Sequence, residues 1–248
     1  MKLLVLLLGF GVMTLAPAFA SSTDAETVVL LHGLGRTRFS MARLACELER
    51  DGYRVINLSY PSRTQSLEEN ATKWLHAQLA QVQTPRLHFV THSMGGILVR
   101  LWLSEHGAPA NLGRVVMLAP PNAGSEVSDR LTSFPAARWL VGPNMGRLTT
   151  APDALPATLG PWPATAGELG VIAGDRPMNR LMAAFLPAPS DGKVTVASTH
   201  LAGERDHVVL PYSHTWLGWR AETIGHVKAF LRDGKFGGRR GPLGPPVS

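Results

Sequence analysis

The sequence contains one cysteine, Cys46, among 248 residues, so no disulfide bond can form within the chain. Its stability must therefore come from a hydrophobic core, and a chain of this length can bury a substantial one. No shift in composition divides the sequence, which predicts a single domain. Cys46 falls on the apolar face of a predicted helix, and we expect its thiol to be buried and inert.

A strong charge imbalance is also absent, since the formal net charge is only +6 and part of the excess lies in the C-terminal tail. No basic stripe interleaved with aromatic residues occurs, which argues against nucleic-acid binding as the main role. The mild excess is compatible with contact at an anionic membrane surface or with an anionic substrate. Nothing in the sequence indicates the oligomeric state.

The N-terminal apolar run, from Leu3 to Leu15, is too short to span a bilayer. It follows Lys2 and leads to Ala18-Phe19-Ala20, and this combination is typical of a cleavable secretory signal over residues 1–20. We expect cleavage after Ala20 and a mature protein that is periplasmic or secreted. An uncleaved membrane anchor is the alternative interpretation.

Apolar runs alternate with amphipathic segments from residue 26 to residue 233. The predicted strands are 26–31, 54–58, 87–90, 115–119 and 168–173, with a strand-like alternation at 193–197. The predicted helices are 39–50, 67–82, 97–105, 178–186 and 221–231. Near-continuous apolar strands suit a parallel sheet that is covered on both faces, so we predict an α/β fold with a mostly parallel, doubly wound sheet.

Two segments depart from this alternation. Residues 121–166 are rich in proline, glycine and scattered apolar residues, and with a predicted helix from Glu126 to Trp139 they indicate a cap inserted over a pocket. Residues 234–248 show no periodicity, and we expect a disordered tail that leaves a domain spanning 21–233.

Ser93 lies where a predicted strand meets a predicted helix, in Thr91-His92-Ser93-Met94-Gly95. This arrangement favours a nucleophile elbow, although Thr91 stands where the usual pattern has glycine. In doubly wound sheets, sites form at the carboxyl ends of strands, where His32-Gly33-Leu34-Gly35 also lies. We expect the N–H groups of Leu34 and Met94 to bind an oxyanion.

Other residues of the two motifs receive supporting roles. Gly33 lets the backbone approach the substrate. His32 orients its loop by hydrogen bonding and is not expected to bind a metal. His92 precedes the serine, so its side chain should point away or line the pocket.

A serine hydroxyl needs a base and a carboxylate that orients the base. His214, in a loop before the last helix, is the favoured base and His207 is second, because His200 follows a predicted strand and His226 falls on a solvated helix face. The carboxylate remains open on these grounds. Asp175 and Asp191 are nearly equal candidates, and Asp206, a third candidate, could instead hold the His214 loop.

Val-Thr-His-Ser-Met-Gly-Gly, Leu-Leu-His-Gly-Leu-Gly and Ala-Pro-Pro-Asn-Ala-Gly-Ser together resemble the α/β-hydrolase superfamily, and the chain is most similar to bacterial lipases and esterases over residues 26–232. In similar lipases the catalytic aspartate lies in an Asn-Asp-Gly-x-Val stretch some twenty residues before the histidine. The resemblance therefore implies Asp191 as the acid. Trp216 stands where many such lipases have a calcium-binding aspartate, so calcium dependence is not implied. We expect no metal and no cofactor.

The sequence thus predicts a serine hydrolase that cleaves a small-molecule carboxylic ester through an acyl-enzyme on Ser93, with His214 and Asp191. An acyltransferase or thioesterase with the same residues is the nearest alternative. A binding protein of this fold without turnover is the alternative from another class, and the departure from the motif at Thr91 is its only support.

Overall fold

A parallel sheet of six strands forms the centre of the computed structural model, which describes residues 25–133, 142–178 and 186–237. The strand order is β2-β1-β3-β4-β5-β6, and each neighbouring pair is parallel. The strands are β1 (Thr27–Leu31), β2 (Arg54–Leu58), β3 (Leu87–His92), β4 (Leu112–Leu118), β5 (Leu169–Gly174) and β6 (Asp206–Leu210). The predicted doubly wound architecture is therefore confirmed.

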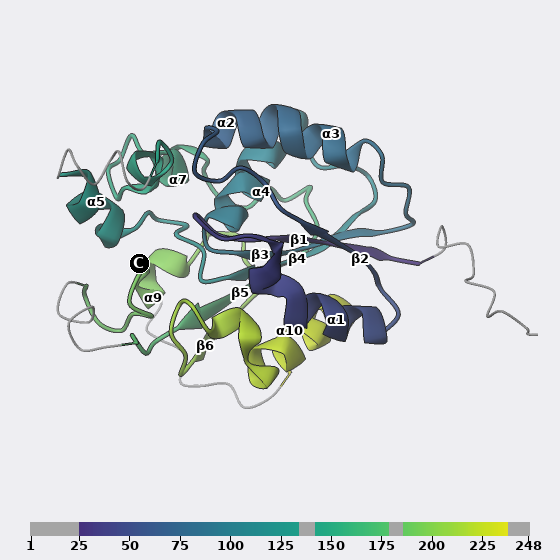
Figure 1. Cartoon of the computed structure of the whole chain (residues 1–248). Helices are drawn as coiled ribbons and strands as arrows, with labels where there is room; N and C mark the ends of the chain where they lie inside the picture. The colour runs from purple at the N-terminus through teal and green to yellow at the C-terminus, as the bar shows by residue number, and fades with distance from the viewer. Residues whose placement is uncertain (1–24, 134–141, 179–185, 238–248) are drawn as a thin grey trace, which may run out of the picture.

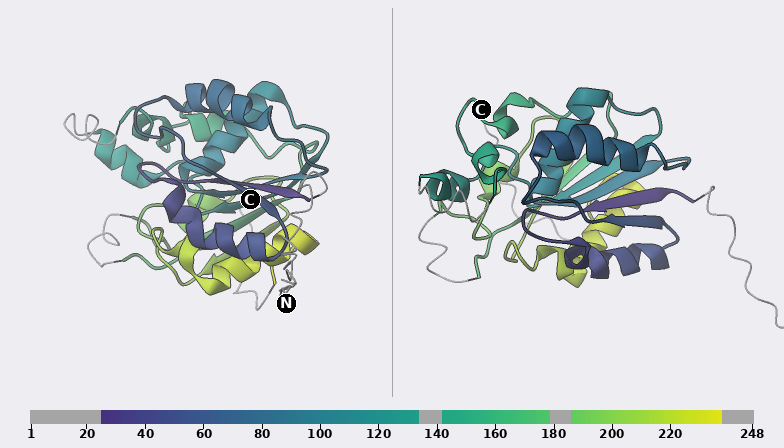
Figure 2. Two further views of the ribbon diagram at one scale, coloured as in Figure 1. Left: turned by 45° about the vertical axis from the view of Figure 1, so that its right-hand side comes forward. Right: turned by 45° about the horizontal axis from the view of Figure 1, so that its top comes forward.

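Helices cover both faces of the sheet (Figure 1). One face carries α1 (Ala42–Arg50) and α10 (Ala221–Asp233). The other carries α4 (Met94–His106) and a continuous helix made of α2 (Leu67–Glu69), a π-helical stretch (Asn70–Leu75) and α3 (His76–Leu79). The same three layers are visible from two other sides in Figure 2.

Alternate residues of the strands enter two separate hydrophobic clusters. In β1, Val29 and Leu31 join the cluster under α4, whereas Val28 and Leu30 join the cluster under α1 and α10. Because both faces are buried, the strand sequence is apolar at nearly every position.

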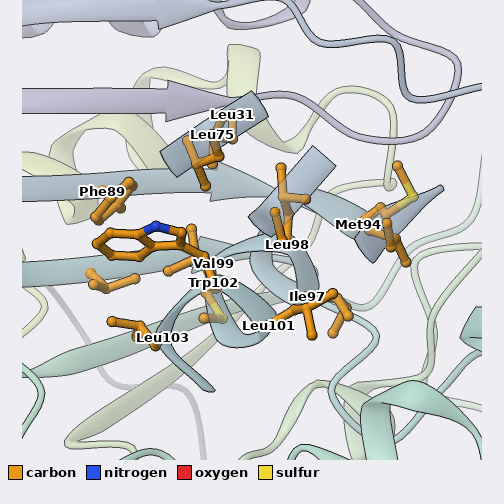
Figure 3. Packing of buried hydrophobic residues seen from close by; sticks show 14 of the residues in the cluster. Leu31, Leu75, Phe89, Met94, Ile97, Leu98, Val99, Leu101, Trp102 and Leu103 are labelled. Carbon is orange, nitrogen blue, oxygen red and sulfur yellow. The ribbon is translucent and has the colours of Figure 1, made fainter. Parts of the chain in front are cut away.

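Helix α4 is buried along most of its length, from Met94 to Leu103. Figure 3 shows Leu98 and Trp102 of this helix packed with Phe89 of β3 and Leu75 of the helix above it. The N-terminus of α4 passes close to β1, since a Cβ added at Gly95 would lie 2.7 Å from the carbonyl oxygen of Leu31. A side chain at this position would push apart the two elements that frame the end of the sheet.

The predicted cap lies beyond the carboxyl ends of the strands (Figure 1). Its described elements are α5 (Glu126–Thr132), a 3-10 turn (Met145–Leu148) and α7 (Leu155–Thr158). The helix predicted to reach Trp139 is shorter than expected: α5 ends at Thr132, and 134–141 lie outside the described residues.

Arg100 of α4 ties this cap to the sheet layer. Its buried guanidinium donates hydrogen bonds to the carbonyl oxygens of Asn122, Pro156 and Gly160. Burial lowers the pKa of Arg100 to about 10, so the group stays charged at neutral pH and its charge is satisfied by these oxygens.

The predicted strand at 193–197 is wrong. Thr195 caps a short helix, α9 (Val196–Thr199), by accepting a hydrogen bond from the Ser198 N–H, and this local bond outcompetes an extended conformation. His200 therefore follows a helix. Most of the predicted helix at 178–186 lies outside the described residues.

Two further expectations are corrected by the packing. Cys46 is exposed, because Leu44, Ala45 and Leu48 form the buried face of α1. His226 is buried rather than solvated, with its ring against Phe236.

The expected disorder from residue 234 is wrong for Phe236, whose N–H donates to Asp206 and whose ring packs on the Phe230 ring. Residues 1–24 and 238–248, which include the predicted signal, lie outside the described residues. Among the helices that the structure describes, none combines the length and the apolar character needed to cross a membrane.

Gly95→Ala is expected to destabilise the fold by about 1–3 kcal/mol, because the new methyl group meets backbone rather than a movable side chain. Gly225→Ala in α10 is the matched control, since a Cβ there meets no heavy atom within 4 Å. Removing that helical glycine should stabilise by about 0.4–1 kcal/mol. Urea unfolding measures both values, and a Gly95→Ala protein as stable as the parent would contradict the expectation.

Candidate active site

The site forms where the strand order reverses, between β1 and β3. In such sheets the loops after the two strands leave in opposite directions and open a crevice at the carboxyl edge. Here the loop after β1 meets the turn after β3: a Cβ added at Gly33 would lie 3.0 Å from the Ser93 Cβ and 3.1 Å from His92 Nδ1. Glycine at position 33 is what lets the two backbones come this close.

Ser93 occupies a strained backbone conformation, with φ 54° and ψ −125°. Positive φ is uncommon for residues other than glycine, and such strain concentrates at functional sites. The surrounding structure maintains it: the Ser93 N–H donates to the Leu118 carbonyl of β4, and the Gly96 N–H donates to the Ser93 carbonyl. The predicted sharp turn between strand and helix is therefore present.

Ser93 and His214 line one small cavity of about 90 Å³. Its walls come from the loop after β1, the cap and the segment after Asp191. The other lining residues are Gly33, Leu34, Arg36, His92, Pro121, Ser125, Val127, Ser128, Met145, Leu148, Lys193 and Val194. Most of the cap residues in this set are apolar, so the hydroxyl of Ser93 faces a space suited to a short apolar group.

The His214 ring is held by Asp191. The His214 Nδ1–H donates to Asp191 Oδ2 across 2.7 Å, and both side chains are buried. The N–H groups of Lys193 and Val194 donate to the other carboxylate oxygen, each at 2.9 Å. With its charge satisfied by three donors, Asp191 fixes the tautomer of His214 and leaves Nε2 to accept a proton.

The competing acids lie elsewhere. Asp175 follows β5 but is partly exposed, 4.0 Å from the Arg176 guanidinium. Asp206 accepts hydrogen bonds from the N–H groups of His207 and Phe236, so it secures the start of the tail and not the His214 loop. Of the three candidates, Asp191 is the one that contacts His214.

His207 and His200, two other candidates for the base, form hydrogen bonds outside the cavity. His207 bonds Thr199 through Nε2, and burial together with the charge of His200 lowers the pKa of His207 to about 3. His200 pairs with Glu204 at 2.6 Å.

The side-chain ligand atoms of His200, Glu204 and His207 lie within 4.8 Å of one another. The two imidazoles, however, are stacked 3.8 Å apart with only 17° between their planes. Ring nitrogens of nearly parallel stacked rings do not converge on one ion, so we assign no metal to this group.

His32 fixes the loop after β1, as its position suggested. Its Nδ1–H donates to the Gly33 carbonyl, and its Nε2 accepts from the Tyr60 N–H. The Tyr60 hydroxyl donates to the His32 carbonyl, and the two rings stack at 4.4 Å. Burial lowers the pKa of His32, which keeps the ring neutral, as both bonds require. The sequence offered no signal for Tyr60.

His92 lines the cavity and has a contact that the sequence did not reveal. Its Nε2–H donates to the His214 carbonyl across 2.9 Å, and the two ring centroids lie 4.7 Å apart. Burial lowers the pKa of His92 well below its ordinary value, with the nearby His214 as a further cause. His92 is thus a neutral donor that positions the backbone of His214.

Of the two expected oxyanion donors, Met94 directly follows Ser93, and Leu34 follows Gly33, the residue at which the loop after β1 approaches Ser93. Met94 is the first residue of α4, so its N–H has no acceptor within the helix, and its side chain is fully buried. Leu34 lines the cavity. Its two neighbours in the chain are held by hydrogen bonds: the Gly35 N–H donates to the Ser62 hydroxyl, and the Gly33 carbonyl accepts from the Arg36 N–H. That these two amides bind an oxyanion stays a prediction.

The buried neutral histidines predict a loss of stability in acid. Unfolded histidine binds a proton at pH about 6.5, whereas folded His92 and His207 resist protonation. The unfolded state then holds more protons, so the free energy of unfolding should fall as pH drops below about 6.5, by up to about 1.4 kcal/mol per pH unit for each group. His92→Gln and His207→Gln should each reduce this slope in urea titrations. A parent protein equally stable at pH about 7 and about 5 would refute the expectation.

Solved structures with the same fold include several lipolytic enzymes. The mature lipase BlEst2 of Bacillus licheniformis has a TM-score of 0.58 at 17% identity, over 76% of this chain and 84% of the lipase. The esterase Pf2001 of Pyrococcus furiosus has a TM-score of 0.56 at 18% identity, over 86% and 85%. The phospholipase PlaB of Legionella pneumophila has a TM-score of 0.60 at 20% identity, but this chain spans only 53% of its length. At these identities the likeness establishes the fold.

A search of curated proteins found no match. A family model does match, and it covers residues 28–233, which is nearly the whole of the described domain and includes both Ser93 and His214. The chain belongs to the alpha/beta hydrolase family.

Proposed function

We propose that the protein hydrolyses carboxylic esters through an acyl-enzyme on Ser93. The observation that carries the proposal is the shared cavity of Ser93 and His214, with the His214 ring oriented by the buried Asp191. The lipases and esterases among the structural neighbours support an ester as the substrate.

In the proposed reaction, Ser93 Oγ attacks the acyl carbon and its proton passes to His214 Nε2. The negative charge that develops on the carbonyl oxygen is bound by the N–H groups of Leu34 and Met94. Collapse of the tetrahedral intermediate breaks the bond to the alcohol, which leaves with the proton from His214. Water activated by the same histidine then releases the acid and restores Ser93. Transfer to a second alcohol would use the same steps with that alcohol in place of water.

Two buried histidines support this reaction without exchanging protons in it. His92 holds the backbone of His214, and His32 holds the loop that carries Leu34. Both are kept neutral by burial, so the donors that shape the site persist at the pH where His214 must accept a proton.

A fluorophosphonate probe is expected to label the folded protein at Ser93 and to leave Ser93→Ala unlabelled. Asp191→Asn should lower kcat on 4-nitrophenyl butyrate by about 10⁴-fold, because His214 loses the carboxylate that sets its tautomer. Asp175→Asn is the matched control and should retain activity within about twofold, as it lies by Arg176.

Mass spectrometry of the labelled peptide and initial rates provide the two measurements. Failure of the parent protein to react with the probe, or a larger loss in Asp175→Asn than in Asp191→Asn, would contradict the proposed roles.

The size of the cavity predicts a preference for short acyl groups. A cavity of about 90 Å³ is small beside the roughly 300–1,000 Å³ of pockets that enclose larger ligands. Among 4-nitrophenyl esters, kcat/KM should peak at acetyl to butyryl and decline for longer chains. Leu148→Ala, which removes part of the apolar wall, should shift the peak to longer chains. A maximum at decanoyl or beyond in the parent protein would count against this substrate class.

A further inference from the structure

Two cations share the cavity of Ser93, and the proposed ester hydrolysis gives neither of them a role. Arg36 lies in the loop after β1, and Lys193 lies two residues after Asp191. Both line the same small space as Ser93 and His214, so their charges approach it from two different segments.

Neither cation is neutralised by a neighbouring acid. In the described ranges, no carboxylate oxygen lies within 4.0 Å of the Arg36 guanidinium or of Lys193 Nζ, whereas Lys228, Arg114 and Arg147 all form ion pairs. The Arg36 guanidinium donates to the Thr215 hydroxyl, a neutral acceptor. Asp191, two residues before Lys193, attracts the Lys193 charge without forming an ion pair, because its oxygens accept hydrogen bonds from His214 and from the N–H groups of Lys193 and Val194.

The two charges also act on each other. Burial lowers the pKa of Lys193, and repulsion by Arg36 is the second cause. Attraction to Asp191 opposes these two causes but comes after them in size. Two like charges that converge on a partly buried space without an ion-pair partner are unfavourable, and an anion placed between them relieves both the repulsion and the lost solvation.

We infer that Arg36 and Lys193 form a binding site for an anionic group of the substrate, a carboxylate or a phosphate close to the scissile ester bond. The inference rests on the proposed function, because it assigns a substrate class to the same site. The apolar wall of Val127, Met145 and Leu148 would hold the hydrocarbon part of the ester, while the two cations select for charge.

Matched ester pairs test this site and also tell which end of the substrate carries the charge. Mono-4-nitrophenyl glutarate and 4-nitrophenyl valerate have acyl groups of equal length, and the glutarate alone bears a carboxylate. The compounds 1-butyrylglycerol 3-phosphate and 1-butyrylglycerol differ by a phosphate on the leaving group. The readout is the ratio of kcat/KM for the anionic ester to that for its neutral partner.

At least one pair should show a ratio above one in the parent protein. Lys193→Met and Arg36→Gln should each lower that ratio by about tenfold, mainly through KM, whereas Lys193→Arg and Arg36→Lys should keep it within about threefold. The ratio should also fall as salt is added, because Arg36 is exposed to solvent. Arg38→Gln is the control cation, since its guanidinium lies over the Phe39 ring rather than in the cavity.

A ratio at or below one for both pairs, or one that Lys193→Met and Arg36→Gln leave unchanged, would overturn the anion site while the hydrolase survives. If no ester is turned over, the proposed function fails. Calorimetric titration of Ser93→Ala with mono-4-nitrophenyl glutarate then still decides the anion site: binding that weakens about tenfold in Ser93→Ala/Lys193→Met supports it, and equal binding rejects it.

Discussion

The close approach of two backbones at the end of the sheet is the constraint on which the rest of the site depends. Gly33 lets the loop after β1 touch the turn at Ser93, and Gly95 lets the first turn of α4 pass the end of β1. Atoms at either Cβ position would meet neighbours at 3.0 Å or less. The strained backbone of Ser93 is maintained because its N–H donates to the Leu118 carbonyl of β4 and its carbonyl accepts from the Gly96 N–H of α4.

Buried polar groups around Ser93 determine which nitrogen atoms of the neighbouring histidines carry a proton. Asp191 sets the tautomer of His214, and His92 and His32 each donate one ring N–H to a backbone carbonyl. Since burial disfavours their charged forms, the latter two histidines remain donors with a single geometry. In the proposed reaction, proton transfer therefore falls to His214, and the other two histidines hold the backbone around it.

The cap supplies the apolar wall of the cavity, and Arg100 of α4 joins the cap to the sheet layer. That buried cation is satisfied by oxygens from three places in the cap region, in contrast to Arg36 and Lys193, which face the cavity without an acid. The molecule therefore contains two kinds of buried or partly buried cation, one hydrogen-bonded within the protein and one facing the cavity. Arg100 donates hydrogen bonds to oxygens of Asn122, Pro156 and Gly160 and is structural. We propose that Arg36 and Lys193 instead await an anionic group of the substrate.

The sequence by itself indicated the parallel sheet, because strands covered on both faces are apolar at nearly every position, and it located Ser93 through the strand, small residues and helix around it. It also favoured His214 over His207, His200 and His226. It could not decide between Asp175, which follows a predicted strand, and Asp191, which lies in an Asp-Gly turn, because the spacing of the residues favours neither. Only the tertiary structure brought Asp191 to His214. The same holds for Tyr60 behind His32, the His92 bond to His214, and the meeting of Arg36 with Lys193, because these contacts join segments distant in the chain and leave no local periodicity that a sequence could display.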